Sequence, residues 1–160
     1  MLERIVIVGA SSGIGAALAA ALARPGRILG LVARRPDALA QVAAVVTARG
    51  GTAVVEPCDA SDVAAADPTW HRLYDRMGGI DALVHCAGIM PTVGPDEFPA
   101  EQDRDVLQTN LVGAVAWLDA GAHTFLGQGH GTLCAIGSVA GDRGRRKHPA
   151  YAASKAGLHT

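Results

Sequence analysis

Short runs of aliphatic and β-branched residues alternate along the chain with longer stretches rich in alanine and leucine. The short runs have the length of buried strands, and the longer stretches have the length and apolar spacing of helices. We predict strands over residues 4–8, 28–33, 52–57, 81–86 and 131–136, and helices over residues 14–23, 36–49, 61–77, 101–126 and from 149 onward. Pro68 should interrupt the third helix, and residues 91–99 should form a loop.

Strand and helix follow each other with short connections, which is typical of an open parallel sheet joined by right-handed crossovers. The chain shows no linker, no low-complexity segment and no internal repeat of roughly 20 to 50 residues. We therefore predict a single α/β domain over residues 1–160, with a doubly wound, Rossmann-like sheet that carries helices on both faces.

The composition narrows the classes of partner. The 160 residues include 20 glycines and are 49% hydrophobic but only 4% aromatic, so we predict a core of alanine, valine, leucine and isoleucine. The net charge is −1, from 14 basic and 15 acidic residues, which offers no basic field for nucleic acid or an anionic membrane. No apolar run approaches the roughly 20 residues of a membrane span.

Cys58, Cys86 and Cys134 are widely spaced and form no CxxC pair, and the six histidines show no ligand spacing. The sequence therefore predicts neither a disulfide framework nor a metal site. This cysteine usage favours a reducing compartment, and the strand that begins at residue 4 leaves no room for a signal peptide. We expect a cytoplasmic protein.

A glycine-rich loop, Gly9-Ala10-Ser11-Ser12-Gly13-Ile14-Gly15, joins the first predicted strand to the first predicted helix. Glycines at such a junction let the backbone turn sharply and approach a pyrophosphate, and the helix N-terminus offers NH groups and partial positive charge. A purely structural turn is the alternative. The strand before and the helix after the loop favour phosphate binding by Gly9, Ser11, Ser12, Gly13, Ile14 and Gly15.

This loop resembles the cofactor loop of the short-chain dehydrogenases/reductases, although Val8 stands where that family usually has threonine. Further elements of the family follow in its order along nearly the whole chain. The resemblance implies an NAD(P)-dependent oxidoreductase that moves hydride between nicotinamide and a secondary alcohol or ketone. It also implies five strands in the order 3-2-1-4-5, without the last strands and the substrate-covering segment that family members carry.

The end of the second predicted strand bears on which dinucleotide binds. An acid there would bond the ribose hydroxyls of NAD, whereas a cation would hold the extra phosphate of NADP. The sequence has Ala33-Arg34-Arg35, so Arg34 and Arg35 favour NADP(H), with NAD(H) as the alternative and two solvated arginines as the structural reading. The resemblance places Asp59 and Ala60 beside the adenine.

His85-Cys86-Ala87-Gly88 stands at the end of the fourth predicted strand, in a place that resembles the Asn-Asn-Ala-Gly segment of the family. Ala87 and Gly88 keep the small residues that pass behind the adenine ribose, and Cys86 stands beside them as a further cofactor-binding position. His85 and Cys86 lose the side-chain amides of the family pattern. With no paired base in sight, Cys86 is interpreted as a packing residue rather than a nucleophile.

Tyr151 and Lys155 lie four residues apart and therefore share one face of the helix that Pro149 opens. Reduction of a ketone needs a proton donor where negative charge develops on oxygen. The ordinary pKa of tyrosine, about 10, makes it a poor acid–base group at neutral pH. A nearby cation stabilises the phenolate and lowers that pKa, and Lys155 can supply it.

Ser138 ends the fifth predicted strand and Asn110 lies within the long helix. Together with Tyr151 and Lys155 they resemble the catalytic tetrad of the family in type, order and element. The resemblance implies that Ser138 donates to the substrate oxygen, that Tyr151 and Lys155 also contact the cofactor, and that Asn110 holds a water linking Lys155 to solvent. Each residue alone has a structural reading, but their joint order favours catalysis.

Two hypotheses stay open: an NADP-dependent oxidoreductase for small carbonyl or alcohol substrates, or a dinucleotide-binding module without turnover. The missing strands would leave an exposed edge, and this edge and the long helix suggest a homo-oligomer. Arg143, Arg145, Arg146 and Lys147 form a basic stretch just before Tyr151. It is either a solvated loop or a contact for an anionic substrate.

Overall fold

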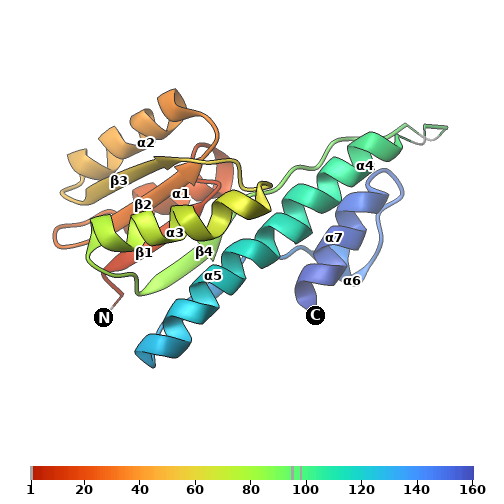
Figure 1. The fold of residues 1–160 in the computed structure, drawn as a ribbon. Helices are drawn as coiled ribbons and strands as arrows, with labels where there is room; N and C mark the ends of the chain where they lie inside the picture. The colour runs from red at the N-terminus through yellow and green to blue at the C-terminus, as the bar shows by residue number, and fades with distance from the viewer. Residues whose placement is uncertain (1, 95, 98) are drawn as a thin grey trace.

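The computed structural model describes residues 2–94, 96, 97 and 99–160, and Figure 1 shows a sheet beside a long helix that runs past it. The elements in chain order are β1 (Arg4–Val8), α1 (Gly13–Leu22), β2 (Ile28–Ala33), α2 (Pro36–Ala48), β3 (Thr52–Pro57), α3 (Val63–Met77), β4 (Ala82–His85), α4 (Ala100–Leu107), η1 (Gln108–Val112), α5 (Gly113–Gln128), β5 (Thr132–Ala135), α6 (Val139–Asp142) and α7 (Pro149–His159).

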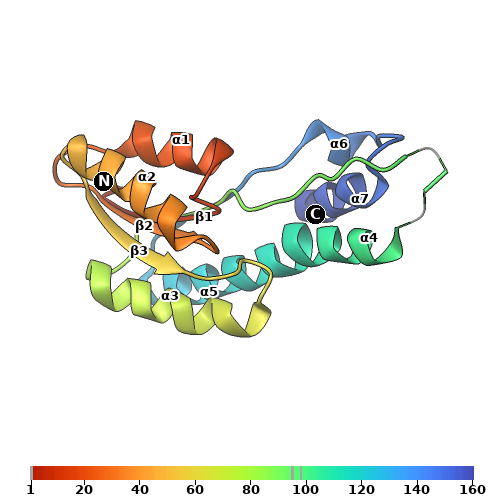
Figure 2. The same cartoon turned by 90° about the horizontal axis from the view of Figure 1, so that it is seen from above.

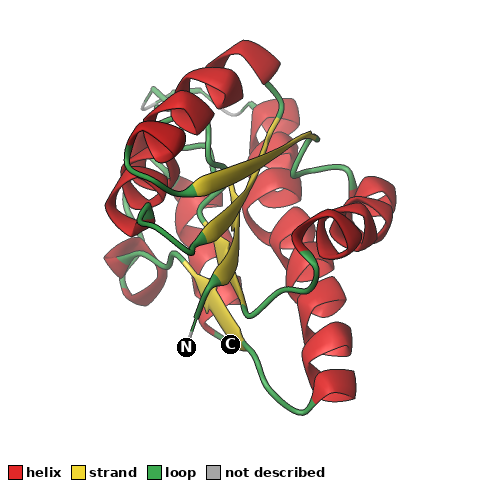
Figure 3. Cartoon of the chain, turned by 90° about the vertical axis from the view of Figure 1, so that its left-hand side faces the viewer, coloured by secondary structure: helices red, strands yellow, loops and turns green. Residues whose placement is uncertain are grey.

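The strands form one parallel sheet in the order β3-β2-β1-β4-β5, which confirms the predicted topology. Val8 pairs with Val32 and with His85, and His85 pairs with Ala135, so four strands end nearly level at one edge. Figure 3 shows helices on both sides of this sheet. The crevice at the carboxyl edge, where the strand order reverses, is where such sheets bind ligands.

α1 and α2 cover one face of the sheet (Figure 2), and the side chains buried there are aliphatic, as predicted. Ile5 and Ile7 of β1 and Leu29 and Leu31 of β2 pack there with Leu39 of α2, and each is at most 4% exposed. Strands whose residues are buried on both faces read as continuous apolar runs, which is why these segments were predictable.

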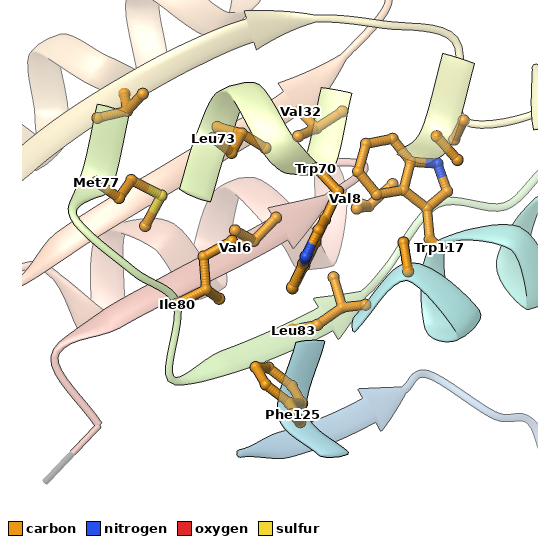
Figure 4. Packing of buried hydrophobic residues seen from close by; sticks show 14 residues of the cluster. Val6, Val8, Val32, Trp70, Leu73, Met77, Ile80, Leu83, Trp117 and Phe125 are labelled. Carbon is orange, nitrogen blue, oxygen red and sulfur yellow. The ribbon is translucent and has the colours of Figure 1, made fainter. Parts of the chain in front are cut away.

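The opposite face, covered by α3 and α5, corrects the prediction of an aliphatic core. Trp70 and Trp117 are fully buried there against Val6, Val8 and Leu83 (Figure 4). The rings of Trp70 and Phe125 meet edge to face, with centroids 5.8 Å apart. A few large rings fill the space between α3, α5 and the sheet, so a low aromatic count does not mean that aromatic residues stay outside the core.

The predicted long helix is present but is interrupted in its middle by a π-helical segment. α4, η1 and α5 follow one another without a break in Figure 1, and the wider η1 turn carries Asn110. Such π segments occur frequently at functional sites, because the extra residue in the turn redirects a side chain. The pattern of apolar residues does not show this insertion.

Two further local predictions need correction. Pro68 lies inside α3 without breaking it, because it costs only one hydrogen bond near the start of a helix held to the sheet by Trp70, Leu73 and Met77. α6 is a short helix that the sequence analysis did not predict, and Ser138 caps it by accepting a hydrogen bond from the NH of Ala140 at 3.2 Å.

β5 lies at the edge of the sheet, as the family resemblance implied. Thr132, Leu133 and Cys134 are exposed there. Among the described residues, no helix is long and apolar enough to cross a membrane.

Candidate functional site

A cavity of about 410 Å³ opens at the carboxyl ends of β1, β2 and β4. We call it the nucleotide cavity. Its lining contains most of the residues predicted to bind a dinucleotide, while Gly15, Tyr151 and Lys155 lie outside it. The lining residues are Gly9, Ser11, Ser12, Gly13, Ile14, Ala33, Arg34, Arg35, Asp59, Ala60, Cys86, Ala87, Gly88, Ile89 and Thr109.

The glycines of the loop have two different tasks. Gly9 has φ +88°, and a Cβ there would lie 2.5 Å from the backbone nitrogen of Ala87, while a Cβ at Gly15 would overlap the carbonyl of Gly9. These two glycines therefore let the loop, α1 and the end of β4 pack together. At Gly13, with φ +55°, a Cβ would meet no atom within 4 Å, so this part of the backbone is open to the cavity.

The first turn of α1 is suited to an anion. Gly13 and Ile14 at its start line the cavity, and the side chain of the N-cap residue Ser12 makes no capping hydrogen bond. Backbone NH groups in the first turn of a helix have no partners within the helix, and the helix dipole adds partial positive charge there. The open backbone at Gly13 and this helix end fit a pyrophosphate group.

Cationic side chains close the cavity on the β2 side. Arg35 donates from Nη2 to the hydroxyls of Ser11 and Ser12, at 3.2 Å each. The Nη1 atom of Arg34 lies 3.7 Å from Oδ2 of Asp59. This arrangement places two guanidinium groups and two hydroxyls beside the end of β2, where the predicted extra phosphate would lie.

Asp59 is held as a carboxylate. Burial works against its ionisation, but hydrogen bonds from the NH and hydroxyl of Ser61 to Oδ1, at 2.9 and 2.7 Å, and the charge of Arg34 lower the pKa of the carboxyl below its ordinary value. Asp59 therefore enters the cavity as an acceptor with a fixed orientation.

The predicted catalytic pair on α7 is brought together. Nζ of Lys155 lies 5.9 Å from the centroid of the Tyr151 ring and donates to the carbonyl of Ile136, just past β5, at 2.7 Å. Lys155 is only 5% exposed, and burial lowers the pKa of its ammonium group. Because Ser138 follows Ile136 by two residues, this bond also brings α7 to the segment that carries the predicted serine.

The side chain of Asn110 forms its hydrogen bonds with residues other than Tyr151 and Lys155. Its Oδ1 accepts from the NH of Ile89 at 2.7 Å, and its Nδ2 donates to the carbonyl of Ile89 at 2.9 Å and to the hydroxyl of Ser154 at 3.2 Å. Ser154 in turn donates to the carbonyl of Tyr151 at 2.7 Å. Asn110 therefore joins the wall of the nucleotide cavity to the helix that carries Tyr151.

Two residues at the end of β4 have strongly shifted pKa values. Burial, with the charge of Lys155 as a second cause, lowers the pKa of His85 to about 4, and among the described atoms its Nε2 has no hydrogen-bond partner. Burial, with Cys134 as a second cause, raises the pKa of the Cys86 thiol to about 11. His85 is therefore neutral and Cys86 a thiol at neutral pH, which agrees with a packing role for Cys86.

Residues 3–160 match the sequence model of a family described as short chain dehydrogenase. The chain belongs to this family. It is 39% identical over 158 residues to an uncharacterized oxidoreductase of Myxococcus xanthus, covering 97% of this chain and 61% of the relative. It is 30% identical over 156 residues to the ketoacyl reductase HetN of a Nostoc species, covering 98% of this chain and 54% of that protein.

Solved structures of a dehydrogenase and of a ketoreductase are similar to nearly the whole chain. NAD⁺-bound xylitol dehydrogenase has a TM-score of 0.92 and 28% identity, over 98% of this chain and 60% of that one. Actinorhodin polyketide ketoreductase with NADPH has a TM-score of 0.89 and 29% identity, over 98% of this chain and 61% of that one. The chain thus spans about three fifths of the length of such relatives.

Several residues of the site were not predicted from the sequence. Ile89 and Thr109 line the nucleotide cavity, and Ser154 links Asn110 to Tyr151. Ser154 lies between Tyr151 and Lys155 in the sequence, and this position could have marked it as a residue of the site. Ile89 is used through its backbone, which no side-chain pattern reveals. Among the described residues, no cluster of three metal-ligating side chains occurs.

Proposed function

We propose that this short-chain dehydrogenase binds NADP(H) in the nucleotide cavity and transfers hydride between it and a secondary alcohol or ketone. The observation that carries the proposal is the chain of hydrogen bonds from Ile89 through Asn110 and Ser154 to Tyr151. It ties the cofactor pocket and the acid–base helix into one site.

The preference for NADP(H) rests on the end of β2. No acid stands at residues 33–35, and Arg35 with the hydroxyls of Ser11 and Ser12 offers donors suited to a phosphate. An acidic side chain in this place would instead bond the ribose hydroxyls of NAD. The similar solved structures include one with NAD⁺ and one with NADPH, so this residue-level argument is the basis for the choice.

The mechanism follows from the polar groups around α7. The nicotinamide, when bound, supplies or accepts the hydride. Tyr151 donates the proton that the carbonyl oxygen needs, and the buried ammonium of Lys155 stabilises its phenolate. Oγ of Ser138 accepts from the NH of Ala140 at 3.2 Å, which leaves its own proton free for the substrate oxygen.

Asn110 has a positioning role in this mechanism. Both protons of its amide are used by Ile89 and Ser154, while its oxygen keeps one acceptor site beyond the bond to Ile89. The family resemblance implies a water that links Lys155 to solvent. In this structure such a water would bind at the remaining acceptor site of the Asn110 oxygen.

Cofactor titrations test the first part of the proposal. NADPH should bind the purified chain more tightly than NADH, and Arg35→Ala should weaken NADPH binding about tenfold or more, because a charge-assisted contact is lost. Binding of NADH should change little in the variant. A chain that prefers NADH contradicts the assignment of Arg34 and Arg35.

A ketone panel with Tyr151→Phe tests the second part. The variant should lose at least about 100-fold in turnover, the usual contribution of general acid–base catalysis, and keep its affinity for NADPH. Normal turnover by the variant would show that the proton donor is wrong.

A dinucleotide-binding module without turnover is the second candidate. The chain spans 61% of its Myxococcus relative, and residues 132–134 of β5 are exposed. Tight binding of NADPH with no reduction of any ketone in the panel would favour this second candidate.

Association and compartment are further parts of the proposal. Val112, Val115 and Leu126 along η1 and α5, and Leu133 on β5, are 41% exposed or more, which supports a contact between copies of the chain. The three cysteines are all unpaired, which fits a reducing compartment such as the cytoplasm. The oligomeric state can be measured by light scattering.

A further inference from the structure

The segment between α6 and α7 concentrates positive charge beside the candidate site. Arg143, Arg145, Arg146 and Lys147 supply four of the 14 basic residues of the chain within five positions. We call these four residues the basic loop. All four are exposed, and among the described residues none of their side chains has a hydrogen-bond or ion-pair partner.

Both ends of the basic loop are fixed. At its start, Nδ1 of His159 lies 3.2 Å from Oδ1 of Asp142, and Nε2 of the same ring accepts from the NH of Ser138 at 3.4 Å. One imidazole thus spans α6 and engages the acidic residue that precedes the basic loop. The glycines at 137 and 141 leave room for this ring, since a Cβ at either would come within 2.8 Å of it.

The far end is tied to the chain that leaves the nucleotide cavity. The carbonyl of Lys147 accepts from the NH of Val93 at 3.1 Å, and Nδ1 of His148 donates to the carbonyl of Pro91 at 3.0 Å. Figure 2 shows these two segments side by side, beyond the end of the sheet. The backbone of the basic loop is therefore held in place, while its four side chains form no ion pair with any residue that the structure describes, although Asp142 lines one hollow together with three of them.

A hollow of about 690 Å³ lies against the basic loop. It is lined by Val139, Asp142, Arg143, Gly144, Arg145 and Arg146. One residue of the lining, Val139, directly follows Ser138, the proposed donor to the substrate oxygen, and the others include three arginines of the basic loop. The hollow therefore starts one residue along the chain from the proposed donor, although Ser138 is not part of its lining.

We propose that the basic loop is an anion-binding subsite, and that the carbonyl substrate carries a phosphate or similar group that Arg143, Arg145 and Arg146 bind. This proposal rests on the function proposed above and names the substrate class. Four like charges within five positions of the chain repel one another, and a bound anion relieves that repulsion. Guanidinium groups suit a phosphate because they donate two parallel hydrogen bonds.

The kinetic test compares two ketones that differ only in the anion: 5-oxohexyl phosphate and 6-hydroxyhexan-2-one. Saturating NADPH keeps Arg34 and Arg35 occupied during the assay. The KM of the phosphate ester should be about tenfold lower than that of the neutral ketone, and it should rise with ionic strength. Equal KM values for the two ketones would overturn the proposal.

A matched pair of variants locates the effect. Arg145→Gln with Arg146→Gln should abolish the preference for the phosphate ester and leave kinetics on the neutral ketone unchanged. The control variant Arg49→Gln with Arg104→Gln also removes two positive charges, one at the end of α2 and one in α4. It should keep the preference for the phosphate ester. A preference that survives in the first variant, or disappears in both, overturns the assignment to the basic loop.

Direct binding separates this proposal from the proposed function. If neither ketone is reduced, the oxidoreductase proposal fails, and calorimetry with 5-oxohexyl phosphate on the NADPH-saturated chain still tests the basic loop. Binding that weakens about tenfold in the Arg145→Gln, Arg146→Gln variant supports the subsite. Equal binding to both proteins, or no binding, contradicts it.

Discussion

β1 at the centre of the sheet and β5 at its edge both end at the candidate site, yet they are packed very differently. Ile5 to Val8 of β1 are at most 4% exposed, whereas Leu133 of β5 is 41% exposed. The nucleotide side, formed by β1, β2, β3, α1 and α2, is held by close backbone approach and buried side chains. The side that carries the proposed catalytic residues, which we call the catalytic side, is formed by β5, α6 and α7 and is tied to the rest largely by individual side-chain hydrogen bonds.

On the nucleotide side, residue size decides whether the backbone segments can pack, whereas on the catalytic side hydrogen bonds decide where the polar groups lie. On the nucleotide side a residue of the wrong size disturbs backbone against backbone, so stability should suffer first. On the catalytic side, bonds such as Lys155 to the carbonyl of Ile136 and Asn110 to Ser154 place polar groups without a closed core around β5. Four measurements test this contrast, in order of expected effect.

Gly9→Ala should have the largest effect. The new methyl group would lie 2.5 Å from the nitrogen of Ala87 and require φ near +88°, so we expect a loss of at least about 3 kcal/mol in the free energy of unfolding. Urea denaturation measures it. The control Gly13→Ala has a similar strain, with φ +55°, but no nearby atom, and should lose only about 1 kcal/mol. Equal losses would show that close packing is not what holds this side.

Acidification should reveal the buried imidazole that stands between the two sides. His85 has a pKa of about 4 in the folded protein and 6.5 ordinarily, so below pH 6.5 the unfolded chain binds a proton that the folded protein does not. The free energy of unfolding should therefore fall by about 3 kcal/mol as pH drops from 6.5 to 4.

The matched histidine variants make this test specific. His85→Asn should flatten the pH dependence within that window, whereas His71→Asn, on the exposed surface of α3, should leave it as in the parent. The carboxyl of Asp81, whose pKa is lowered to about 2, contributes only below that window. An unchanged slope in His85→Asn would mean that another group is responsible.

Asn110→Ala tests the bridge between the two sides. It removes the partner of both backbone groups of Ile89 and of the Ser154 hydroxyl, and we expect a loss of about 2 kcal/mol in the free energy of unfolding. Gln108 is the first residue of the same η1 segment, and Gln108→Ala removes a single hydrogen bond to the carbonyl of Ser61. This variant should lose only about 1 kcal/mol in the free energy of unfolding. A cost for Asn110 no greater than for Gln108 would remove the argument for a bridge.

The same contrast explains which parts of the fold and of the candidate site could be predicted from the sequence. The positions of the strands follow from apolar runs, and the positive φ of Gly9 and Gly13 is a local need of the loop that joins strand to helix. The order of the strands and the cavity residues outside this loop are implied by the family resemblance. The partners of Asn110 were not predictable, because they depend on the π-helical turn at η1 and on the backbone of Ile89. The short helix α6 and the contacts of His159 with Asp142 and Ser138 likewise depend on segments that are distant in the sequence.

Thiol labelling should show the smallest difference and the most direct one. Cys134 lies on exposed β5, whereas Cys86 is half-buried and its pKa of about 11 leaves roughly 100-fold less thiolate than a thiol of pKa 9. With iodoacetamide at pH 8, mass spectrometry of the peptides should find Cys134 modified at least about tenfold faster than Cys86.

The unfolded chain in urea is the control, and there the two cysteines should react at similar rates. If Cys134 in the folded protein is as slow as Cys86, something covers β5 in solution, and a second copy of the chain is the occupant that the exposed leucine and valine side chains favour. Dilution of the protein then distinguishes the cases, because a rate that rises on dilution identifies self-association at this edge, and a constant rate excludes it.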